Sequence, residues 1–301
     1  MNRPYNLKGE QIHSREIVAS DLDVVAKFLT NSFRYSPEYF PELLDTLTKH
    51  PTPTGYPKYG RVLLSGNIIV GVILLIFSAI RLGTKCSIRC NVTTWSVDPA
   101  YRPYAAIFFS KALGDKVVTY LNILHLSQSL PFIKLQSFSK FTDGQFAAIP
   151  LLSRRLDEGT VQLVPPVAVS NNSNLDPFEQ ELLLAHANYG CISLWCITKD
   201  SAHPFVFQQY RFKGIIPGLQ LVYCRDVKDF VRFARPIGLF LASRGGFFVS
   251  VNSSGPIAGL CGKYFAGVRP VYFKGPTPQM GDLAYTQAVM HRQPRRPFWR
   301  R

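Results

Sequence analysis

The segment Thr93–Leu113 has the residue pattern best suited to bind a ligand. An apolar β-type run ends at Val97, passes through a short Pro-containing turn, and leads into an apolar helical pattern that begins near Tyr104. A strand that feeds a helix through a tight loop leaves backbone N–H groups unpaired at the helix start, and these groups bind anions. Arg102 adds a positive charge directly before that start. The segment therefore predicts a site for a phosphate or pyrophosphate.

The run Val97–Ala105, which reads Val-Asp-Pro-Ala-Tyr-Arg-Pro-Tyr-Ala, resembles the acyl-CoA-binding loop of the GCN5-related N-acetyltransferase (GNAT) superfamily. The family pattern is Arg or Gln, two residues, Gly, one residue, then Gly or Ala. Here Ala105 takes the place of the first Gly and Ile107 that of the second small residue. Ala permits close backbone approach but resists positive φ, and Ile107 is expected to point into the core. An ordinary βα turn with one surface Arg is the alternative interpretation.

The resemblance implies that acetyl-CoA or another acyl-CoA is the cofactor. Its pyrophosphate would lie on the loop. The strand before the loop would offer an edge to the pantetheine arm and, from Trp95–Val97, a backbone N–H to the developing oxyanion. The residues expected to contact the cofactor are Trp95, Ser96, Val97, Arg102, Pro103, Tyr104, Ala105, Ala106 and Ile107.

Acid–base groups are harder to assign. The superfamily often places a Tyr after the next strand, as the acid that protonates the leaving thiolate, but residues 125–138 contain no Tyr. His125 and Ser127 are therefore the candidate acids, with a surface loop histidine as the alternative interpretation of His125. Glu38, Glu42 and Asn91 are the candidate bases on the acceptor side, and each is also compatible with a purely structural role.

Other kinds of site find little support in the sequence. The pairs Cys86/Cys90 and Cys191/Cys196 lack histidine partners at ligand spacing, so no metal site is expected. No Walker loop, GxGxxG run or GxSxG elbow is present. The six cysteines mostly lie in apolar runs, as buried free thiols do, and this usage favours a reducing cytoplasm.

The composition is that of a globular protein with a basic surface. The chain has 301 residues, 47% of them hydrophobic, and a net charge of +15. Such a charge favours anionic cofactors, anionic membranes and nucleic acids; the Arg-rich segment His291–Arg301 fits a nucleic-acid contact or a disordered tail. The run Ile68–Ile80 is much shorter than the roughly 20 residues of a membrane-spanning helix, and it is expected to be a buried strand.

The expected elements follow the GNAT order. They are a strand, two helices, three strands, the loop, a helix, a strand at 117–124, a helix near 129–137 and a strand at 144–152. The second half repeats part of this order without a cofactor loop: a helix from Pro177 to Asn188, three strands, a helix at 227–243 bent at Pro236, and strands at 246–251 and 281–286. The runs Leu221–Ala234 and Gly281–Thr286 resemble segments of bacterial GNAT-like proteins.

These observations predict an α+β fold of two tandem GNAT-like domains, each a mixed, mostly antiparallel sheet flanked by helices. The expected boundaries are 1–152 for an acyl-CoA-binding domain, 153–176 for a linker, 177–290 for a degenerate second domain, and 291–301 for a basic tail. The resemblance implies an acyltransferase that moves an acyl group from CoA to an amine or hydroxyl of a small molecule or polymer precursor. The first alternative is an inactive acyl-CoA-binding or regulatory protein. The second, which rests on the basic charge alone, is a nucleic-acid-binding protein.

Overall fold

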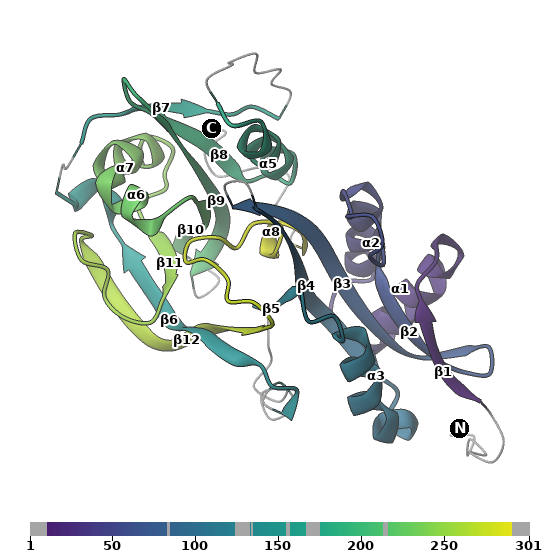
Figure 1. Cartoon of the computed structure of the whole chain (residues 1–301). Helices are drawn as coiled ribbons and strands as arrows, with labels where there is room; N and C mark the ends of the chain where they lie inside the picture. Colours follow the sequence, from purple (N-terminus) through teal and green to yellow (C-terminus); the bar gives the residue numbers. More distant parts are fainter. Residues whose placement is uncertain are drawn as a thin grey trace. The chain divides into compact units, whose positions relative to one another are not determined.

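The chain folds into two compact units in the computed structural model, which describes residues 11–82, 85–123, 133, 135–154, 157–166, 175–212 and 216–290 (Figure 1). The N-terminal unit comprises Met1–Ser139 and Phe273–Thr277, and the C-terminal unit comprises Lys140–Tyr272 and Pro278–Arg301. The division falls before the expected linker at 153–176.

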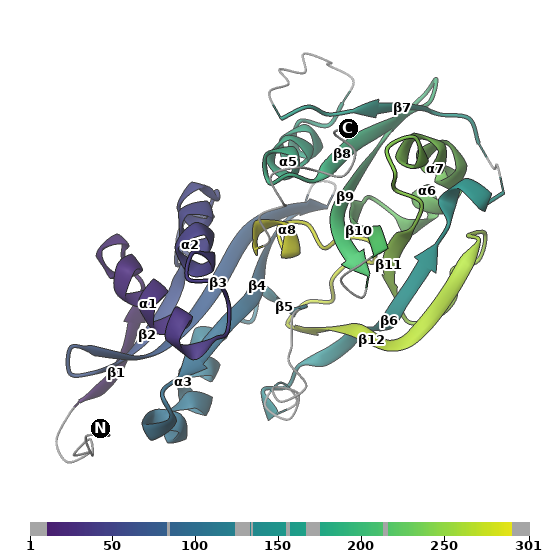
Figure 2. The ribbon, with the colours of Figure 1, turned by 180° about the vertical axis from the view of Figure 1, so that it is seen from behind.

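In the N-terminal unit the hydrogen-bonded strands follow the order β1-β2-β3-β4-β5. The strands β1 to β4 pair antiparallel with one another, whereas β5 runs parallel to β4. Figures 1 and 2, from opposite sides, show α1 and α2 on one face of this sheet and α3 on the other. The elements are β1 (Ile12–Glu16), η1 (Ala19–Asp21), α1 (Leu22–Ser32), α2 (Tyr39–Lys49), β2 (Gly60–Ser65), β3 (Ile68–Leu82), β4 (Lys85–Val97), η2 (Pro99–Tyr104), α3 (Ala105–Ala112) and β5 (Thr119–Asn122).

Local sequence explains the elements that carry this sheet. The apolar residues of α1 and α2 recur at helical spacing and are buried against β3 and its neighbours. The α2 helix ends at Lys49, because Pro51 disfavours helical geometry at His50. The apolar run at 68–80 forms the buried strand β3, as predicted, and Gly66 at φ +57° makes the turn that leads into it. No helix among the residues that the structure describes is long and apolar enough to cross a membrane.

The C-terminal unit contains a sheet in the order β7-β8-β9-β10-β11-β6-β12. Neighbours from β7 to β10 are antiparallel, β10 and β11 are parallel, and β6 pairs antiparallel with β11. The elements are β6 (Ser139–Ala148), η4 (Pro150–Leu152), β7 (Thr160–Leu163), α5 (Pro177–Asn188), β8 (Ile192–Ile197), β9 (Ala202–Phe212), β10 (Ile216–Cys224), α6 (Val227–Arg232), α7 (Ala234–Ala242), β11 (Val249–Ser253), β12 (Gly262–Lys274) and α8 (Gln287–Met290).

Helices flank both faces of this second sheet. Phe230 and Phe233, from α6 and its end, pack with Leu221 and Cys224 of β10 in one hydrophobic core. Tyr223 directly precedes Cys224, and a register shift separates it from Leu221, so it points to the other face, where its hydroxyl donates to Glu179 of α5 at 3.3 Å. The helix α5 has the predicted bounds, because Asp176 Oδ1 accepts the Glu179 N–H at 3.0 Å and Pro177 occupies the first helical position.

Two expectations for the second half need correction. The helix predicted at 227–243 is two helices, α6 and α7, separated at Phe233. Pro236 explains the break, because its ring has no N–H and would clash with the carbonyl of Arg232, four residues earlier. The expected strand at 281–286 is wrong: only the single bridge Tyr223↔Asp282 forms, since Gly281 at φ +84° and Tyr285 at φ +57° leave extended geometry.

Two strands were missed by sequence reasoning. The strand β7 lies inside the segment expected to be a linker, and β12 lies in a region where no strand was expected. The strand β6, expected near 144–152 as the end of the first domain, pairs with β11 of the C-terminal unit. The helix expected near 129–137 lies mostly outside the described residues, and the basic tail 291–301 lies entirely outside them.

The two units repeat one strand pattern. The strands β1 to β5 and the strands β7 to β11 each form three antiparallel pairs followed by one parallel pair, in chain order. In each unit the fourth strand leads through a capped turn into a helix and then to the parallel fifth strand. The predicted tandem arrangement of two mostly antiparallel sheets flanked by helices is therefore confirmed.

Candidate functional site

The strands β4 and β5 diverge halfway along β4. Their parallel pairing covers three residue pairs and ends at Asn91↔Leu121. A longer ladder would next pair Val92 with Asn122, but it stops there, and β4 continues for six more residues to Val97. The part of β4 after Asn91 is thus paired with β3 on one side and parts from β5 on the other. Such an edge can accept an extended, amide-containing ligand in the manner of an added strand.

A β-bulge lies on this part of β4. The register with β3 pairs Leu75 with Val92 but Ile73 with Trp95, so β4 has one extra residue at Thr93–Thr94. A bulge leaves its extra residue outside the regular ladder and re-aims the backbone around it. Sequence reasoning placed the oxyanion donor at Trp95–Val97 and missed the bulge, because nothing in an apolar, Thr-rich strand marks where a register shifts.

The helix after β4 begins earlier than the sequence indicated. The 3₁₀-helix η2 starts at Pro99 and leads directly into α3. Asp98 caps it: Oδ1 accepts the Ala100 N–H at 2.9 Å, and the Asp98 carbonyl accepts the Tyr101 N–H at 2.8 Å. The Ala105 N–H already donates to the Arg102 carbonyl. The first N–H groups of this helical segment are therefore engaged by the chain itself.

The loop residues predicted to contact a cofactor differ in exposure. Arg102 is exposed, and within the described part of the chain its guanidinium has no recorded ion pair or hydrogen bond. Pro103 and Tyr104 are also exposed, and Ala105 is half-buried, as is Ala106 beside it. Ile107 is 61% exposed, contrary to the expectation that it packs in the core. Arg102 is thus a surface arginine that forms no ion pair within the described residues.

The strand residues Trp95, Ser96 and Val97 are all half-buried. The Trp95 ring packs edge-on against Phe109 of α3 with centroids 5.4 Å apart, which ties the end of β4 to the helix. At the end of the strand, the Asp98 N–H donates to the Val70 carbonyl at 2.8 Å. The backbone between bulge and helix is therefore held firmly on its β3 side.

Asn122, at the end of β5, carries a buried acceptor without a partner. The residue is 3% exposed, and its Oδ1 receives no hydrogen bond from the part of the chain that the structure describes. Leaving a buried amide oxygen unpaired costs about 1–3 kcal/mol. Asn122 follows the last residue that pairs with β4, so this acceptor lies where the two strands part. It is the kind of group that a bound amide N–H would satisfy, and sequence reasoning did not single it out.

The structure does not place the candidate acid–base groups beside the open edge of β4. His125 and Ser127 lie outside the described residues. Glu38 is exposed before α2, and Asn91 is buried within the β4–β5 ladder. Burial raises the pKa of the Cys90 thiol well above its ordinary value, so this thiol is a poor nucleophile. No group of three or more His, Cys, Asp or Glu side chains in the described ranges is arranged to hold a metal ion.

The C-terminal unit has a corresponding edge, and the chain itself fills it. The strands β10 and β11 pair only at Leu219↔Val249 and Gln220↔Ser250, after which β10 continues to Cys224. A register shift between Leu221 and Tyr223 again gives the fourth strand one extra residue. Here, however, the Cys224 N–H donates to the Gly281 carbonyl at 2.9 Å, and the Leu283 N–H donates to the Val222 carbonyl at 2.8 Å.

A buried histidine holds this filling segment in place. His186 of α5 accepts the Tyr285 N–H at Nε2, at 3.0 Å, and its Nδ1 lies 2.8 Å from the Leu182 carbonyl. The His186 and Tyr285 rings are 4.6 Å apart. The segment Asp282–Thr286 is almost completely buried. The edge of β10 is therefore part of the core, whereas the edge of β4 meets a buried acceptor without a partner.

Comparisons with known proteins bear on the fold. No protein-family model matches the sequence, and no curated protein matches it significantly. Among solved structures, a GCN5-related N-acetyltransferase from Anabaena variabilis is 10% identical, with a TM-score of 0.52 over 87% of this chain and 72% of that one. One from Kribbella flavida is 12% identical, with a TM-score of 0.50 over 88% and 71%. A Pyrococcus horikoshii protein is 15% identical, with a TM-score of 0.52 over 95% and 97%. The chain therefore has the fold of the GCN5-related N-acetyltransferase superfamily, in a tandem arrangement.

Proposed function

We propose that the N-terminal unit binds an acyl-CoA along the open edge of β4 and transfers its acyl group to an amine or hydroxyl of a small acceptor. One observation carries the proposal: a bulged fourth strand leaves its parallel neighbour after Asn91, beside a helix start and a buried amide oxygen that lacks a partner. The pantetheine arm is a chain of amides that matches such an edge. The GNAT fold of the whole chain supports this choice of ligand.

The residues have distinct roles in this proposal. A backbone N–H at the Thr93–Thr94 bulge, or at Trp95–Val97 after it, would donate to the oxyanion that develops on the thioester carbonyl. Arg102 would contact a phosphate of CoA, since its guanidinium is exposed beside the helix start. Asn122 would accept a pantetheine N–H. His125 and Ser127 stay the candidate acids for the leaving thiolate, and transfer otherwise depends on positioning.

A second candidate is an acyl-CoA-binding protein without turnover, and one observation favours it. The Asp98 carboxylate already accepts the first free N–H at the start of η2. A phosphate that approached this helix start would meet a negative charge as well as an occupied donor. Such a site would bind CoA through β4 and Arg102 more than through the helix start, and it would orient the thioester less well for reaction.

The proposal is tested first by calorimetric titration with acetyl-CoA and longer acyl-CoAs. One site per chain is expected, because the edge of β10 is filled. Ala105→Phe should abolish binding and turnover by blocking the loop, whereas Ser110→Phe, at an exposed position of α3 further from the loop, should preserve both. Normal binding and turnover by Ala105→Phe would overturn the placement of the cofactor.

Turnover with a panel of amine and alcohol acceptors separates the two candidates. An enzyme releases CoA with at least one acceptor, and His125→Ala or Ser127→Ala should slow that release by at most about 10²–10⁴-fold while leaving CoA affinity intact. Binding without release of CoA across the panel would favour the non-catalytic protein.

A further inference from the structure

A separate constellation of side chains lies in the C-terminal unit where β8 turns into β9. Ser201 Oγ is 2.9 Å from His203 Nε2, and His203 Nδ1 is 3.1 Å from Asp229 Oδ2. Ser201 is exposed, whereas His203 is 7% exposed and Asp229 lies partly buried in the first turn of α6. A hydroxyl, an imidazole and a carboxylate in this order form the arrangement that activates serine nucleophiles.

We propose that Ser201, His203 and Asp229 form a second reactive site, in which Ser201 is a nucleophile toward small activated acyl compounds, that is, esters or thioesters with a short acyl chain. This site is independent of the acyl-CoA site proposed for the N-terminal unit.

The backbone places these three groups together. Ser201 and His203 are two residues apart at the beginning of β9, so their side chains share a face of the sheet. The helix α6 packs on that same face, with Phe230 in the core, and this brings Asp229 over His203. The ring of Phe233 lies 4.7 Å from the imidazole and supports it. The histidine is therefore fixed by packing, as a catalytic base must be.

Thr198 holds the serine in position. The Ser201 N–H donates to Thr198 Oγ1 at 3.1 Å, and the Thr198 N–H donates to the Ser201 carbonyl at 2.8 Å. The Thr198 hydroxyl lies 3.0 Å from that same carbonyl and can donate its hydrogen there. The Ser201 hydroxyl lies 3.0 Å from Thr198 Oγ1 and 2.9 Å from His203 Nε2, and with the Thr198 hydrogen directed to the carbonyl the Ser201 hydrogen can point toward His203.

Asp229 sets the direction of the proton transfer. Its carboxylate beside Nδ1 favours the tautomer that carries hydrogen on Nδ1 and leaves Nε2 as an acceptor. The Nδ1–Oδ2 contact has the length of an ion pair, but its angle does not yet satisfy a hydrogen bond. Catalytic hydrogen bonds are often poorly aligned before substrate binds. A small rotation of the Asp229 carboxylate would align the hydrogen bond from His203 Nδ1.

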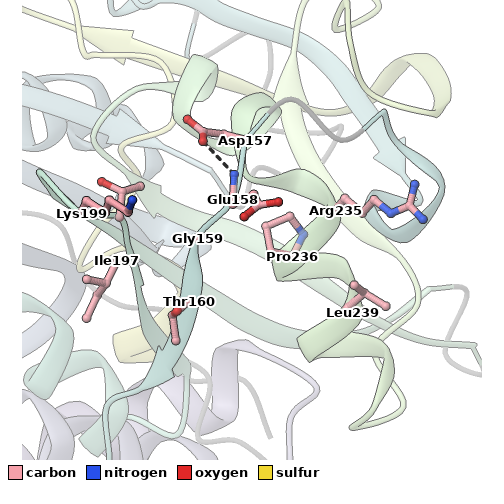
Figure 3. Close-up of a pocket in the computed structure, with 10 residues that line it drawn as sticks. Asp157, Glu158, Gly159, Thr160, Ile197, Lys199, Arg235, Pro236 and Leu239 are labelled. Atoms are coloured by element: carbon pink, nitrogen blue, oxygen red, sulfur yellow. Dashed lines mark hydrogen bonds between the residues drawn. The ribbon is translucent and has the colours of Figure 1, made fainter.

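A pocket of about 560 Å³ adjoins this constellation. Thr198, which holds Ser201, lines the pocket together with Lys199 and Asp157. The Asp157 carboxylate accepts a hydrogen bond from Arg232 Nε at 2.5 Å. Figure 3 shows Lys199 on one side of the pocket and Leu239, from α7, on another. A mixed polar and apolar wall of this size fits a small acyl compound.

The reaction balances without any further reagent except water. Ser201 Oγ forms a bond to the acyl carbonyl carbon while its proton moves to His203 Nε2. The bond from that carbon to the leaving oxygen or sulfur then breaks, and His203 gives the proton to the leaving alcohol or thiol. Water attacks the resulting Ser201 ester, loses a proton to His203, and releases the acid as Ser201 regains its proton.

The first test is covalent labelling of the full chain with a fluorophosphonate probe, followed by digestion and mass spectrometry. The expected result is an adduct on Ser201 that is absent in Ser201→Ala and at least 100-fold slower to form in His203→Ala. Ser254→Ala, at an exposed serine of the same unit, is the matched control and should label normally. Ser201 is exposed, so its loss should leave the fold intact.

Hydrolysis of p-nitrophenyl acetate provides the second readout. Ser201→Ala should lose the activity, and Asp229→Asn should lower kcat at least tenfold with little change in KM, because Asp229 positions the base and does not touch substrate. Lys27→Glu, at an exposed position of α1 in the other unit, should label and hydrolyse normally. The absence of an adduct on Ser201, or equal hydrolysis by wild type and Ser201→Ala, would overturn the proposal whether or not CoA binds.

Discussion

The two units share one strand pattern but treat the free edge of their fourth strand differently. In each unit the fourth strand carries one extra residue and parts early from its parallel neighbour. In the C-terminal unit, Gly281 and Leu283 bond to this edge and close it. In the N-terminal unit the edge lies beside Asn122, whose buried oxygen has no partner. The comparison indicates that a duplicated fold can keep its geometry while a short segment decides which copy has room for a ligand.

Backbone hydrogen bonding gives the physical reason. Buried N–H and carbonyl groups are almost always paired, because an unpaired one costs free energy comparable to a lost hydrogen bond. A strand that diverges from its neighbour within the core creates such groups, and either the chain or a ligand must satisfy them. The C-terminal unit uses its own chain, which adds stability but removes a site.

The turns after the fourth strands sharpen this contrast. Asp98 and Asp226 cap the helix starts in the same way, each accepting the N–H two residues later at 2.9 and 2.8 Å. Four residues after the cap, however, stands Arg102 in one unit and Phe230 in the other. Arg102 is exposed, and Phe230 is completely buried. At this position the N-terminal turn therefore presents an exposed cation and the C-terminal turn a buried aromatic ring.

The largest expected effect concerns His50, a buried histidine that joins α2 to β3 in the N-terminal unit. Its Nε2 lies 2.9 Å from the Phe77 carbonyl and 3.1 Å from Ser78 Oγ, and burial lowers its pKa from 6.5 to about 4. The unfolded chain binds the proton first as the pH falls. Stability is therefore complete above pH 6.5 and decreases toward pH 4, by about 3 kcal/mol in total.

Native-state hydrogen exchange of β3 amides at pH 7, 5 and 4 measures this loss. His50→Gln should be less stable at pH 7, but its stability should change much less between pH 6.5 and 4. His13→Gln, at an exposed histidine of the same unit, should keep the wild-type pH dependence. An equally steep loss in His50→Gln would show that other groups cause the acid sensitivity.

Sequence reasoning succeeded where local patterns decide the structure. The helical spacing of Phe40, Leu43, Leu44 and Leu47 predicted α2, and the Asp176-Pro177 start predicted α5 with its observed bounds. Proline at position 236 correctly indicated an interruption but not its place, since the clash acts four residues earlier. Local patterns were thus enough to predict the helices α2 and α5, but not the strands β7 and β12 of the second half.

What the sequence did not indicate depends on long-range pairing. A bulge at Thr93–Thr94 appears only when the register with β3 is known. The pairing of Gly281–Leu283 with β10 joins segments more than fifty residues apart, and a short irregular segment has no periodicity to reveal it. The orphaned oxygen of Asn122 depends on what surrounds it, not on its own residue type.

The second prediction uses matched charge reversals at the two helix starts. Arg102→Glu places a negative charge beside the CoA phosphates and should weaken acetyl-CoA binding at least tenfold, because charge-assisted hydrogen bonds contribute about 1.5–3 kcal/mol. Lys228→Glu makes the same change in charge beside the start of α6, where no cofactor is expected, and should leave affinity unchanged. Calorimetric titration of both variants decides the matter, and equal losses would indicate only a general charge effect.

The third prediction concerns the buried amides at the ends of the fifth strands. Asn122→Leu removes an unpaired buried acceptor, so the ligand-free protein should become more stable by about 1–3 kcal/mol while acetyl-CoA affinity falls. Asn252→Leu in β11 should instead destabilise the protein: Asn252 Nδ2 also has no partner among the described residues, but its Oδ1 accepts the Gln145 amide at 3.3 Å, and that amide would lose its acceptor. Urea unfolding and CoA titration measure the two effects. Loss of stability in Asn122→Leu would mean that this amide serves the fold and no ligand.

The smallest expected effect tests whether the filled edge of β10 is structural. Gly281 adopts φ +84°, and a Cβ there would lie 2.6 Å from Cys224 Sγ, so Gly281→Ala should cost about 1 kcal/mol or more. Gly255→Ala, with open space around its Cα, should change stability little. Thermal unfolding measures both, and titration should still find one CoA per chain, because Leu283 and its buried neighbours would stay in the core. A second CoA site in Gly281→Ala would show that this segment masks a functional slot, and the contrast between the two units would then be one of regulation and not of loss.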